Sequence, residues 1–221
     1  MLSLVWYLPL FGFTFGFWVV SHVVKGICLK GVKALDVVKY SEDKFPPAEE
    51  FADRLLQGVK DKPAVAAGKF GMYRVRRNVV DLSDIGGRSL GALWEAAHEA
   101  VHVYQQRGGL LLLWGWGAVL LAVGGIVGWW LMYRSHHDPA VMFLLVLASV
   151  FVWAIVDLDA TKKAEGLILA NFSLNQSQRD QLSLLTKLTY LNCFERPAGL
   201  AFLMVAAGFA VFGLSGVVSG V

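Results

Sequence analysis

The sequence predicts a mainly α-helical, polytopic membrane protein with about four transmembrane helices and a small membrane-apposed subdomain that holds a short β-strand. The chain of 221 residues is 56% hydrophobic and only 17% charged, which is too apolar for an ordinary soluble domain. Four runs contain no Asp, Glu, Lys or Arg: residues 1–24, 108–133, 139–156 and 197–221. Each run approaches the roughly 20 residues that a helix needs to cross a bilayer. The polar segment after the first run is long enough to form the subdomain.

The charge-free runs set the predicted domain organisation. Residues 1–24, 110–131, 139–156 and 198–221 are predicted as four transmembrane spans, and residues 25–109 and 157–197 as polar segments between spans. Buried core helices are the competing interpretation, which four such runs in so short a chain disfavour. The first run lacks the basic start and small-residue cleavage site of a signal peptide, so we expect an uncleaved anchor.

The distribution of basic residues predicts the orientation in the membrane. The segment after span one has 14 Lys plus Arg, the link between spans two and three has one, and the segment between spans three and four has five. Basic residues favour the cytoplasmic side. The sequence therefore predicts a multi-pass protein of the inner (plasma) membrane, with residues 25–109 and 157–197 in the cytoplasm and both termini on the other side.

Local patterns predict the elements of the first polar segment. Pro46-Pro47 opens a predicted helix, Ala48–Val59, because proline is tolerated in the first turn. Pro63–Gly71 is predicted as a loop, and Met72–Leu82 as extended. A further helix is predicted to begin at or near Ser89 and to end at Gly108-Gly109. Its apolar positions recur at helical spacing: Leu90, Leu93, Trp94, Ala97 and Val101.

The predicted helix that begins near Ser89 carries the motif His-Glu-x-x-His. His98 and His102 are four residues apart, so a helix places them on one face, where they can hold one metal ion. Imidazole nitrogen suits Zn2+, and a catalytic zinc takes three protein ligands and one open position. Glu99 occupies the general-base position of a metalloprotease. The competing interpretation is a polar helix face with two incidental histidines.

Two histidines leave a third protein ligand to be found. Asp157 and Asp159 follow the third predicted span, on the same predicted side of the membrane as the motif. An aspartate beside an apolar span is costly unless it is solvated, paired or metal-bound. The alternative is an ordinary charge at a helix end. His136 and His137 fall on the opposite predicted side, so we expect them not to bind the metal.

Charge and cysteine content limit the other functions. A net charge of +3 is too small to predict a nucleic-acid partner. Cys28 and Cys193 match no metal-binding or disulfide framework. The predicted partners are therefore the lipid bilayer and a peptide or membrane-protein substrate.

Two motifs together resemble the YugP-like neutral zinc metallopeptidases of bacterial membranes. Ala96–Gln105 is similar to the family's AAHEVGHAIQ, with Val101 in place of its glycine. Asp157–Ala164 is similar to its EFDAS-x-x-A, with Asp157 in place of its glutamate. Shorter similarities support these at Ala48–Ala52, Asn78–Ser83 and Leu188–Tyr190. The resemblance implies a zincin-like subdomain at the bilayer surface, with Asp157 as the third zinc ligand and Asp159 as the alternative.

The predicted function is that of a membrane-embedded zinc metalloendopeptidase that hydrolyses peptide bonds at the membrane surface. Glu99 is the predicted catalytic base, with His98, His102 and Asp157 as the zinc ligands. The strand near Val79 is predicted to pair with a substrate strand. Tyr190 is a candidate oxyanion donor, although packing is the more common role of a tyrosine. The alternatives are a catalytically inactive zinc-binding membrane scaffold and a non-enzymatic membrane partner protein without metal.

Overall fold

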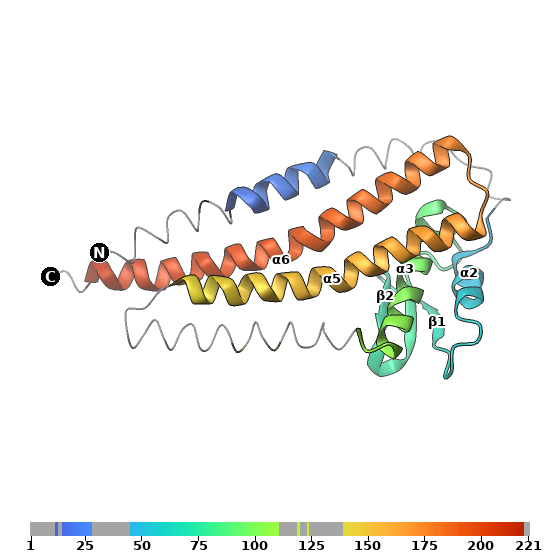
Figure 1. Cartoon of the computed structure of the whole chain (residues 1–221), viewed down its shortest axis with the longest axis horizontal. Helices are drawn as coiled ribbons and strands as arrows, with labels where there is room; N and C mark the ends of the chain where they lie inside the picture. Colours follow the sequence, from blue (N-terminus) through green and yellow to red (C-terminus); the bar gives the residue numbers. More distant parts are fainter. Residues whose placement is uncertain are drawn as a thin grey trace. The chain divides into compact units, whose positions relative to one another are not determined.

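The computed structural model describes residues 12, 15–27, 45–110, 119, 123 and 139–218, with the backbone alone for residues 139–153 and for part of 194–218 (Figure 1). The chain divides into two compact units. Unit 1 comprises Met1–Gly26, Leu113–Ile155 and Leu191–Val221, and unit 2 comprises Ile27–Leu112 and Val156–Tyr190. The candidate metal ligands all belong to unit 2.

Unit 2 contains a three-stranded sheet in the order β1-β3-β2. Strand β1 (Ala64–Ala67) pairs in parallel with β3 (Val79–Leu82), and β2 (Met72–Arg74) pairs antiparallel with the other side of β3. The 3₁₀ helix η2 (Val75–Arg77) and Asn78, whose φ is 52°, turn the chain between β2 and β3. Asparagine adopts this left-handed conformation more readily than most residues. The central strand is therefore β3, and β1 and β2 are the edges.

The sheet differs from the sequence-based prediction at two places. The stretch Met72–Leu82 is a hairpin interrupted by η2, not one extended strand. The predicted loop Pro63–Gly71 contains β1, whose sequence Ala-Val-Ala-Ala has no alternation of polar and apolar residues. Pairing with β3 forms this strand, so the local sequence carried little signal for it.

Helix α3 (Leu90–Arg107) confirms the predicted helix that carries the His-Glu-x-x-His motif. Ser89 caps its start, because the Ser89 hydroxyl accepts a hydrogen bond from the backbone N–H of Ala92 at 3.1 Å. Gly108 is the residue that follows its last turn. The cap and the glycine fix both ends of the helix, and so the position of the motif on it.

Helix α2 (Ala48–Leu55) packs against α3 and completes this side of the core. It ends before the predicted Val59, because the chain turns at Gly58, where φ is 81°. The largest fully buried side chains of unit 2 come from α2 and the residue that follows it, from the sheet, from α3 and from the two long helices: Phe51, Leu56, Leu82, Leu90, Leu93, Ile168 and Leu182. This core supports α3 from the side of the sheet.

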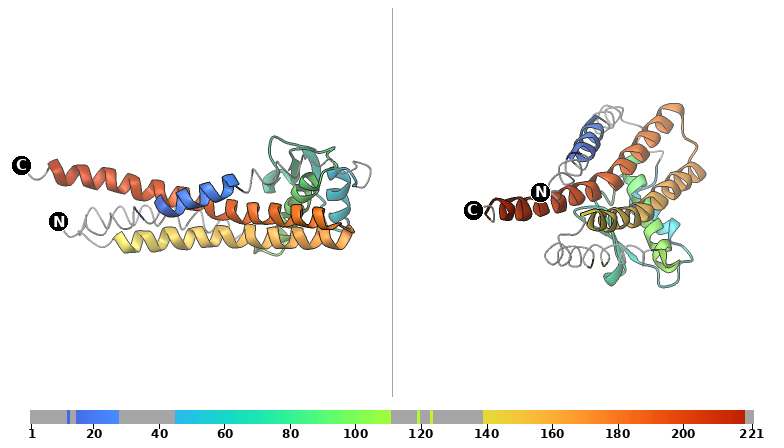
Figure 2. Two further views of the ribbon diagram at one scale, coloured as in Figure 1. Left: turned by 90° about the horizontal axis from the view of Figure 1, so that it is seen from above. Right: turned by 60° about the vertical axis from the view of Figure 1, so that its left-hand side comes forward.

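Two long helices, α5 (Pro139–Asn171) and α6 (Gln176–Val218), contribute residues to both units. Within unit 2, the end of α5 and the start of α6 lie side by side, as both Figure 1 and Figure 2 show. Asn175 and Gln178 cap α6 reciprocally: Asn175 Oδ1 accepts from the Gln178 backbone at 2.9 Å, and Gln178 Oε1 accepts from the Asn175 backbone at 3.0 Å. This reciprocal pair satisfies backbone N–H groups at the start of α6.

The predicted polytopic membrane fold with about four transmembrane helices is wrong, and so is the predicted multi-pass localisation in the inner (plasma) membrane. Among the described residues, no helix combines the length and the apolar character that crossing a bilayer requires. The described side chains of α5 and α6 include many charges: Asp157, Asp159, Lys162, Lys163, Glu165, Arg179, Asp180 and Lys187. Most of the predicted spans 1–24 and 110–131 lies outside the described residues.

Unit 1 contains an ion group in which the buried Glu195 of α6 contacts the exposed His22 and the half-buried Lys25 of helical residues 15–26. Glu195 Oε2 accepts a hydrogen bond from Lys25 Nζ at 2.5 Å, and its Oε1 lies 3.0 Å from His22 Nδ1. Burial opposes the ionisation of Glu195, but the hydrogen bonds from Lys25 and His22 outweigh it and hold the pKa of this carboxyl below its ordinary value. Beside this group, the ring of Trp18 stacks on Phe202 with centroids 5.7 Å apart. The ion group therefore ties the two helical segments of unit 1 together.

We expect this ion group to make the stability of the protein depend on pH in the acidic range. The pKa of Glu195 is lower in the folded state, so its ionised form stabilises that state above the unfolded pKa of about 4.3 and loses this effect as the pH falls through the folded value. Thermal unfolding between about pH 6 and about pH 3 measures the effect. Glu195→Gln should show a shallower loss of melting temperature than wild type, whereas Glu165→Gln should follow wild type. Equal slopes for wild type and Glu195→Gln would contradict this assignment.

Candidate metal centre

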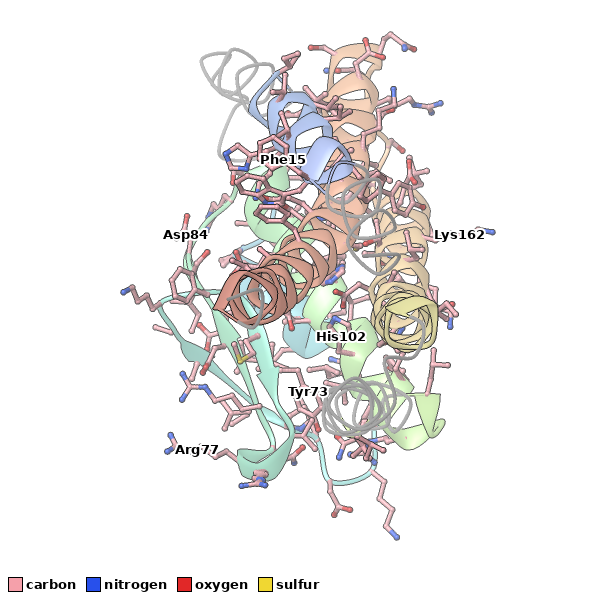
Figure 3. All side chains as sticks on the ribbon, turned by 90° about the vertical axis from the view of Figure 1, so that its left-hand side faces the viewer. Phe15, Tyr73, Arg77, Asp84, His102 and Lys162 are labelled. Atoms are coloured by element: carbon pink, nitrogen blue, oxygen red, sulfur yellow. The ribbon has the colours of Figure 1, made fainter. Side chains whose placement is uncertain are left out.

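Three side chains that suit a metal ion come together in unit 2. Helix α3 presents His98 and His102 on one face, and α5 contributes Asp157. The two Nε2 atoms of the histidines are 3.2 Å apart, and Nε2 of His102 is 3.5 Å from Oδ1 of Asp157. One ligand atom from each of the three residues lies within 4.8 Å of the others. This group could hold a metal ion; Figure 3 marks His102 on α3.

The spacing of these atoms fits tetrahedral coordination. Zinc–nitrogen and zinc–oxygen bonds of about 2.0–2.1 Å place two tetrahedral ligand atoms roughly 3.3 Å apart. The separations of 3.2 Å and 3.5 Å lie on either side of that value. The two imidazole rings meet at 87°, so they are not stacked on each other. The donor atoms are therefore close enough for one ion without rearrangement of α3.

Both histidines favour the neutral state, which is the state that binds metal. Burial, and then the neighbouring His102, lowers the pKa of His98 to about 3. Burial also lowers the pKa of His102, although Asp157, Gln105 and Asp159 act in the opposite direction. The far nitrogen of His98, Nδ1, is buried and has no hydrogen-bond partner in the described part of the chain. The packing around His98 therefore orients its ring. This packing includes Trp94, whose ring centroid lies 6.4 Å from that of His98.

The structure brings Asp157, not Asp159, to the histidines. The Asp159 carboxylate accepts hydrogen bonds from Lys163 at 2.7 Å and from Gln105 at 2.9 Å. Burial opposes ionisation of Asp159, but these hydrogen bonds and the charges of Lys163 and Lys162 lower its pKa. The two aspartates are about 200° apart around a helix, so they face different neighbours. Asp159 acts one step away from the ligand atoms, through Gln105.

Gln105 is the residue of this site that sequence reasoning missed. Its side chain is buried between α3 and α5, and its Oε1 lies 2.7 Å from Nδ1 of His102. The sequence held one signal for it, because a residue three positions after His102 lies on the same helical face. That spacing alone does not distinguish a partner of the histidine from any other residue on that face.

Glu99 lies between α3 and the edge of the sheet. Its side chain is buried, and its Oε2 accepts a hydrogen bond from the backbone N–H of Tyr73 at 2.7 Å. Burial raises the pKa of Glu99 to about 8, and the charges of Glu95, Asp157 and Asp81 act in the same direction against the Tyr73 hydrogen bond. A carboxyl group with so high a pKa is mostly protonated at pH 7, and a nearby cation would favour its ionised form.

The predicted role of Val79 in pairing with a substrate strand is wrong. Val79 begins β3, the central strand, where it pairs with Ala64 of β1 and with Arg74 of β2. Because both sides of β3 are occupied, a further strand has no free backbone groups to pair with there. Tyr190 lies half-buried in α6, and its role as an oxyanion donor stays a prediction. His136 and His137 lie outside the described residues.

The outer edge of β2 is the edge of the sheet next to Glu99. The backbone N–H of Tyr73 donates to Glu99, so it faces away from β3. The Tyr73 hydroxyl lies 3.1 Å from Asn78 Oδ1 and also contacts Gln106 Oε1, so its one hydrogen can be donated to either acceptor. A cavity of about 330 Å³ opens here, lined by Asp61, Tyr73, Val75, Asn78, Gln106 and Arg107. Figure 3 labels Tyr73, and shows Arg77 at the tip of the β2–β3 hairpin.

Comparisons with protein-family models, with curated proteins and with solved structures gave no match to this chain. The resemblance to the YugP-like neutral zinc metallopeptidases thus stays a prediction from the two motifs. The metal-ligand group, by contrast, is described by interatomic distances that are independent of any relative. The interpretation of the site therefore depends on its geometry.

Proposed function

We propose that this protein is a zinc-dependent metallopeptidase. The observation that carries the proposal is the convergence of His98 and His102 on one helix with Asp157 on another, at 3.2 Å and 3.5 Å between ligand atoms. The residue next to the first histidine is Glu99, a buried carboxyl group whose pKa burial raises to about 8. A metal site that serves structure alone has no need of such a base. This combination favours hydrolysis as the reaction.

The donor set favours zinc over magnesium and calcium. Two imidazole nitrogens and one carboxylate oxygen make a three-ligand set, and catalytic zinc sites keep a fourth position open. Magnesium and calcium prefer sites made of oxygen ligands. When bound, zinc would supply a Lewis acid that polarises a carbonyl group and increases the acidity of water. His98, His102 and Asp157 would hold the ion.

Glu99 would carry the proton during hydrolysis. It would accept a proton from the attacking water and donate it to the amine that leaves when the peptide bond breaks. With a pKa of about 8 in the metal-free protein, Glu99 is mostly protonated at pH 7, and the charge of a bound zinc ion would favour the carboxylate that accepts the proton. Burial next to the histidines limits access of bulk water to the transferred proton. Thus one side chain can serve as base and then as acid.

The outer edge of β2 would bind the peptide substrate. An extended peptide can add to a free sheet edge through backbone hydrogen bonds. The N–H of Tyr73 faces this edge, next to Glu99, so a peptide paired there would run past the catalytic carboxyl group. One substrate side chain could enter the cavity lined by Tyr73, Asn78 and Arg107. This edge takes the role that sequence analysis gave to Val79.

One observation favours a second candidate function, a zinc-binding scaffold without hydrolysis. One oxygen of Glu99 is engaged by the Tyr73 N–H, and a substrate strand on β2 would compete with Glu99 for that donor. If Glu99 stays on Tyr73, the substrate strand loses that N–H, and only the other oxygen of the carboxyl group is left to accept a proton from water. The metal site itself would be unchanged, so hydrolysis alone distinguishes the two candidates.

Removal and return of zinc test the proposed function. Purified protein should cleave an unfolded casein-like substrate, lose this activity after dialysis against a chelator, and regain it with one equivalent of zinc. Because the ion completes the site, we expect the loss to be at least about 100-fold. Zinc that binds stoichiometrically without any cleavage would support the scaffold. Cleavage that persists in protein shown to be metal-free would contradict both.

A further inference from the structure

We infer that Gln105 is a positioning residue that joins the metal ligands of α3 to the metal ligand of α5. The inference rests on the metal site of the proposed function, but it concerns a residue that is not a ligand. Gln105 is 3% exposed and contacts both helices through its side-chain amide. Its position three residues after His102 directs the amide toward α5.

The hydrogen bonds of Gln105 fix the orientation of its amide. Nε2 donates to the Val156 carbonyl at 2.8 Å and to Asp159 Oδ2 at 2.9 Å, so both of its hydrogens are used. Oε1 then faces Nδ1 of His102 at 2.7 Å. In the flipped amide, Oε1 would face the two oxygens of Val156 and Asp159, and both contacts would be repulsive. The α5 side therefore determines which atom Gln105 presents to His102.

The fixed amide in turn determines the tautomer of His102. Because Gln105 Oε1 can only accept, Nδ1 of His102 must carry the hydrogen. The lone pair of the neutral ring is then on Nε2, the atom that lies 3.2 Å from His98 Nε2 and 3.5 Å from Asp157. A hydrogen bond to the far nitrogen of a ligating histidine commonly fixes tautomer and ring orientation in this way. His98 has no such partner in the described residues, so this control acts on one histidine only.

Gln105 also positions Asp157 through the backbone. Val156 directly precedes Asp157, and its carbonyl is held by Gln105 Nε2. The same amide thus contacts a ligand on α3 and the residue before a ligand on α5. Loss of its donors should release α5 locally, while loss of its acceptor should release the ring of His102. Both effects would lower metal affinity without removal of a ligand.

A reversal of hydrogen-bond polarity tests this role. In Gln105→Glu, the side chain can still accept from His102, but both donors are lost and the carboxylate faces Asp159. We expect zinc affinity to fall by about 10–100-fold, the usual effect of a lost partner of a metal ligand. Asp159→Asn alone should change little, because its amide oxygen can still accept from Gln105. The double variant, Gln105→Glu with Asp159→Asn, should recover part of the affinity, because the amide introduced at position 159 can donate to the carboxylate introduced at position 105, while the Val156 carbonyl stays without its donor.

Zinc titration against a chelating dye gives the affinities, and the absorption spectrum of the cobalt(II)-loaded protein reports ligand geometry. Gln178→Ala is the matched control: it removes a buried glutamine that caps α6, so it should lower the melting temperature and leave zinc affinity unchanged. The inference is overturned if Gln105→Glu binds zinc like wild type, if the double variant is no better than Gln105→Glu, or if wild type binds no zinc. None of these readouts needs hydrolysis, so a wild type that binds zinc but cleaves nothing would refute only the peptidase.

Discussion

Glu99→Gln is expected to abolish peptide hydrolysis while zinc stays bound. Glutamine has the shape of the protonated carboxyl group, but it cannot accept a proton from water. The loss of a general base costs about 10²–10⁴-fold in rate, so cleavage should fall to near background. Zinc content should remain one per chain, because Glu99 is not one of the three candidate ligands. Melting temperature should not fall, because the buried group no longer carries the cost of ionisation that raises its pKa.

The control for this variant is Glu50→Gln. Glu50 is an exposed residue of α2 that pairs with Arg54 at 2.9 Å, and such surface pairs contribute little to stability. It should keep both zinc and activity. If Glu99→Gln instead keeps full activity, Glu99 is not the base and the peptidase proposal fails. If wild type and Glu99→Gln are both inactive with zinc bound, the scaffold is the better account.

Asp157→Asn is expected to reduce zinc affinity more than any other single change outside the histidines. The variant replaces a charged oxygen ligand by a neutral amide at a position 3.5 Å from Nε2 of His102. The loss should exceed the roughly 10–100-fold that a lost partner of a ligand costs, because a ligand itself is weakened. Competition between the protein and a chelating dye measures the difference. The melting temperature of the metal-free variant should match that of metal-free wild type.

Asp159→Asn provides the comparison, because it makes the same chemical change two residues away on the same helix. Its amide oxygen can still accept from Gln105, so we expect less than about a tenfold loss of zinc affinity. A metal that is released by Asp159→Asn but retained by Asp157→Asn would reverse the assignment of the third ligand. In that case α5 would be rotated relative to the arrangement described here.

The helix that carries the motif could be predicted because its signals are local. Leu90, Leu93 and Trp94 recur at helical spacing, Ser89 provides a cap, and Gly108 follows the last turn. The four-residue spacing of His98 and His102 follows from the helix alone. Once the helix is predicted, the distance between the two imidazoles is limited by its geometry. Two of the three candidate ligands, together with Glu99, therefore lie in one short stretch of the chain.

The rest of the site depends on contacts between distant segments, which no local pattern specifies. The sheet order β1-β3-β2 places Val79 in the central strand, where the predicted pairing with a substrate strand has no free side, and Tyr73 in an edge strand. Gln105 acquires its role only when Val156 and Asp159 pack against it. The third ligand was proposed from a resemblance, and its distance from His102 is set by the packing of α5 on α3. Side-chain contacts of this kind follow from tertiary structure alone.

The long helices show a different limit of sequence reasoning. The predicted span ends at Val156 because the charge-free run ends there. Helix α5 nevertheless continues through Asp157 and the lysines that follow, to Asn171. Charged residues do not stop a helix, and this stretch contains no proline. Similarly, α6 continues through Pro197, where the sequence predicted two separate elements. Hydropathy marks changes of environment, whereas backbone chemistry decides where a helix ends.

X-ray absorption at the zinc edge, on protein loaded with one equivalent of zinc, tests the metal centre most directly. The geometry predicts a shell of nitrogen and oxygen ligands at about 2.0–2.1 Å, with the multiple-scattering signature of two imidazoles. Asp157→Asn should alter this shell, whereas Gln178→Ala should not. A shell with sulfur at about 2.3 Å would place the ion on cysteine instead, and a shell of water oxygens with no imidazole signature would show that His98 and His102 do not hold it. Either result would contradict the metal centre described here.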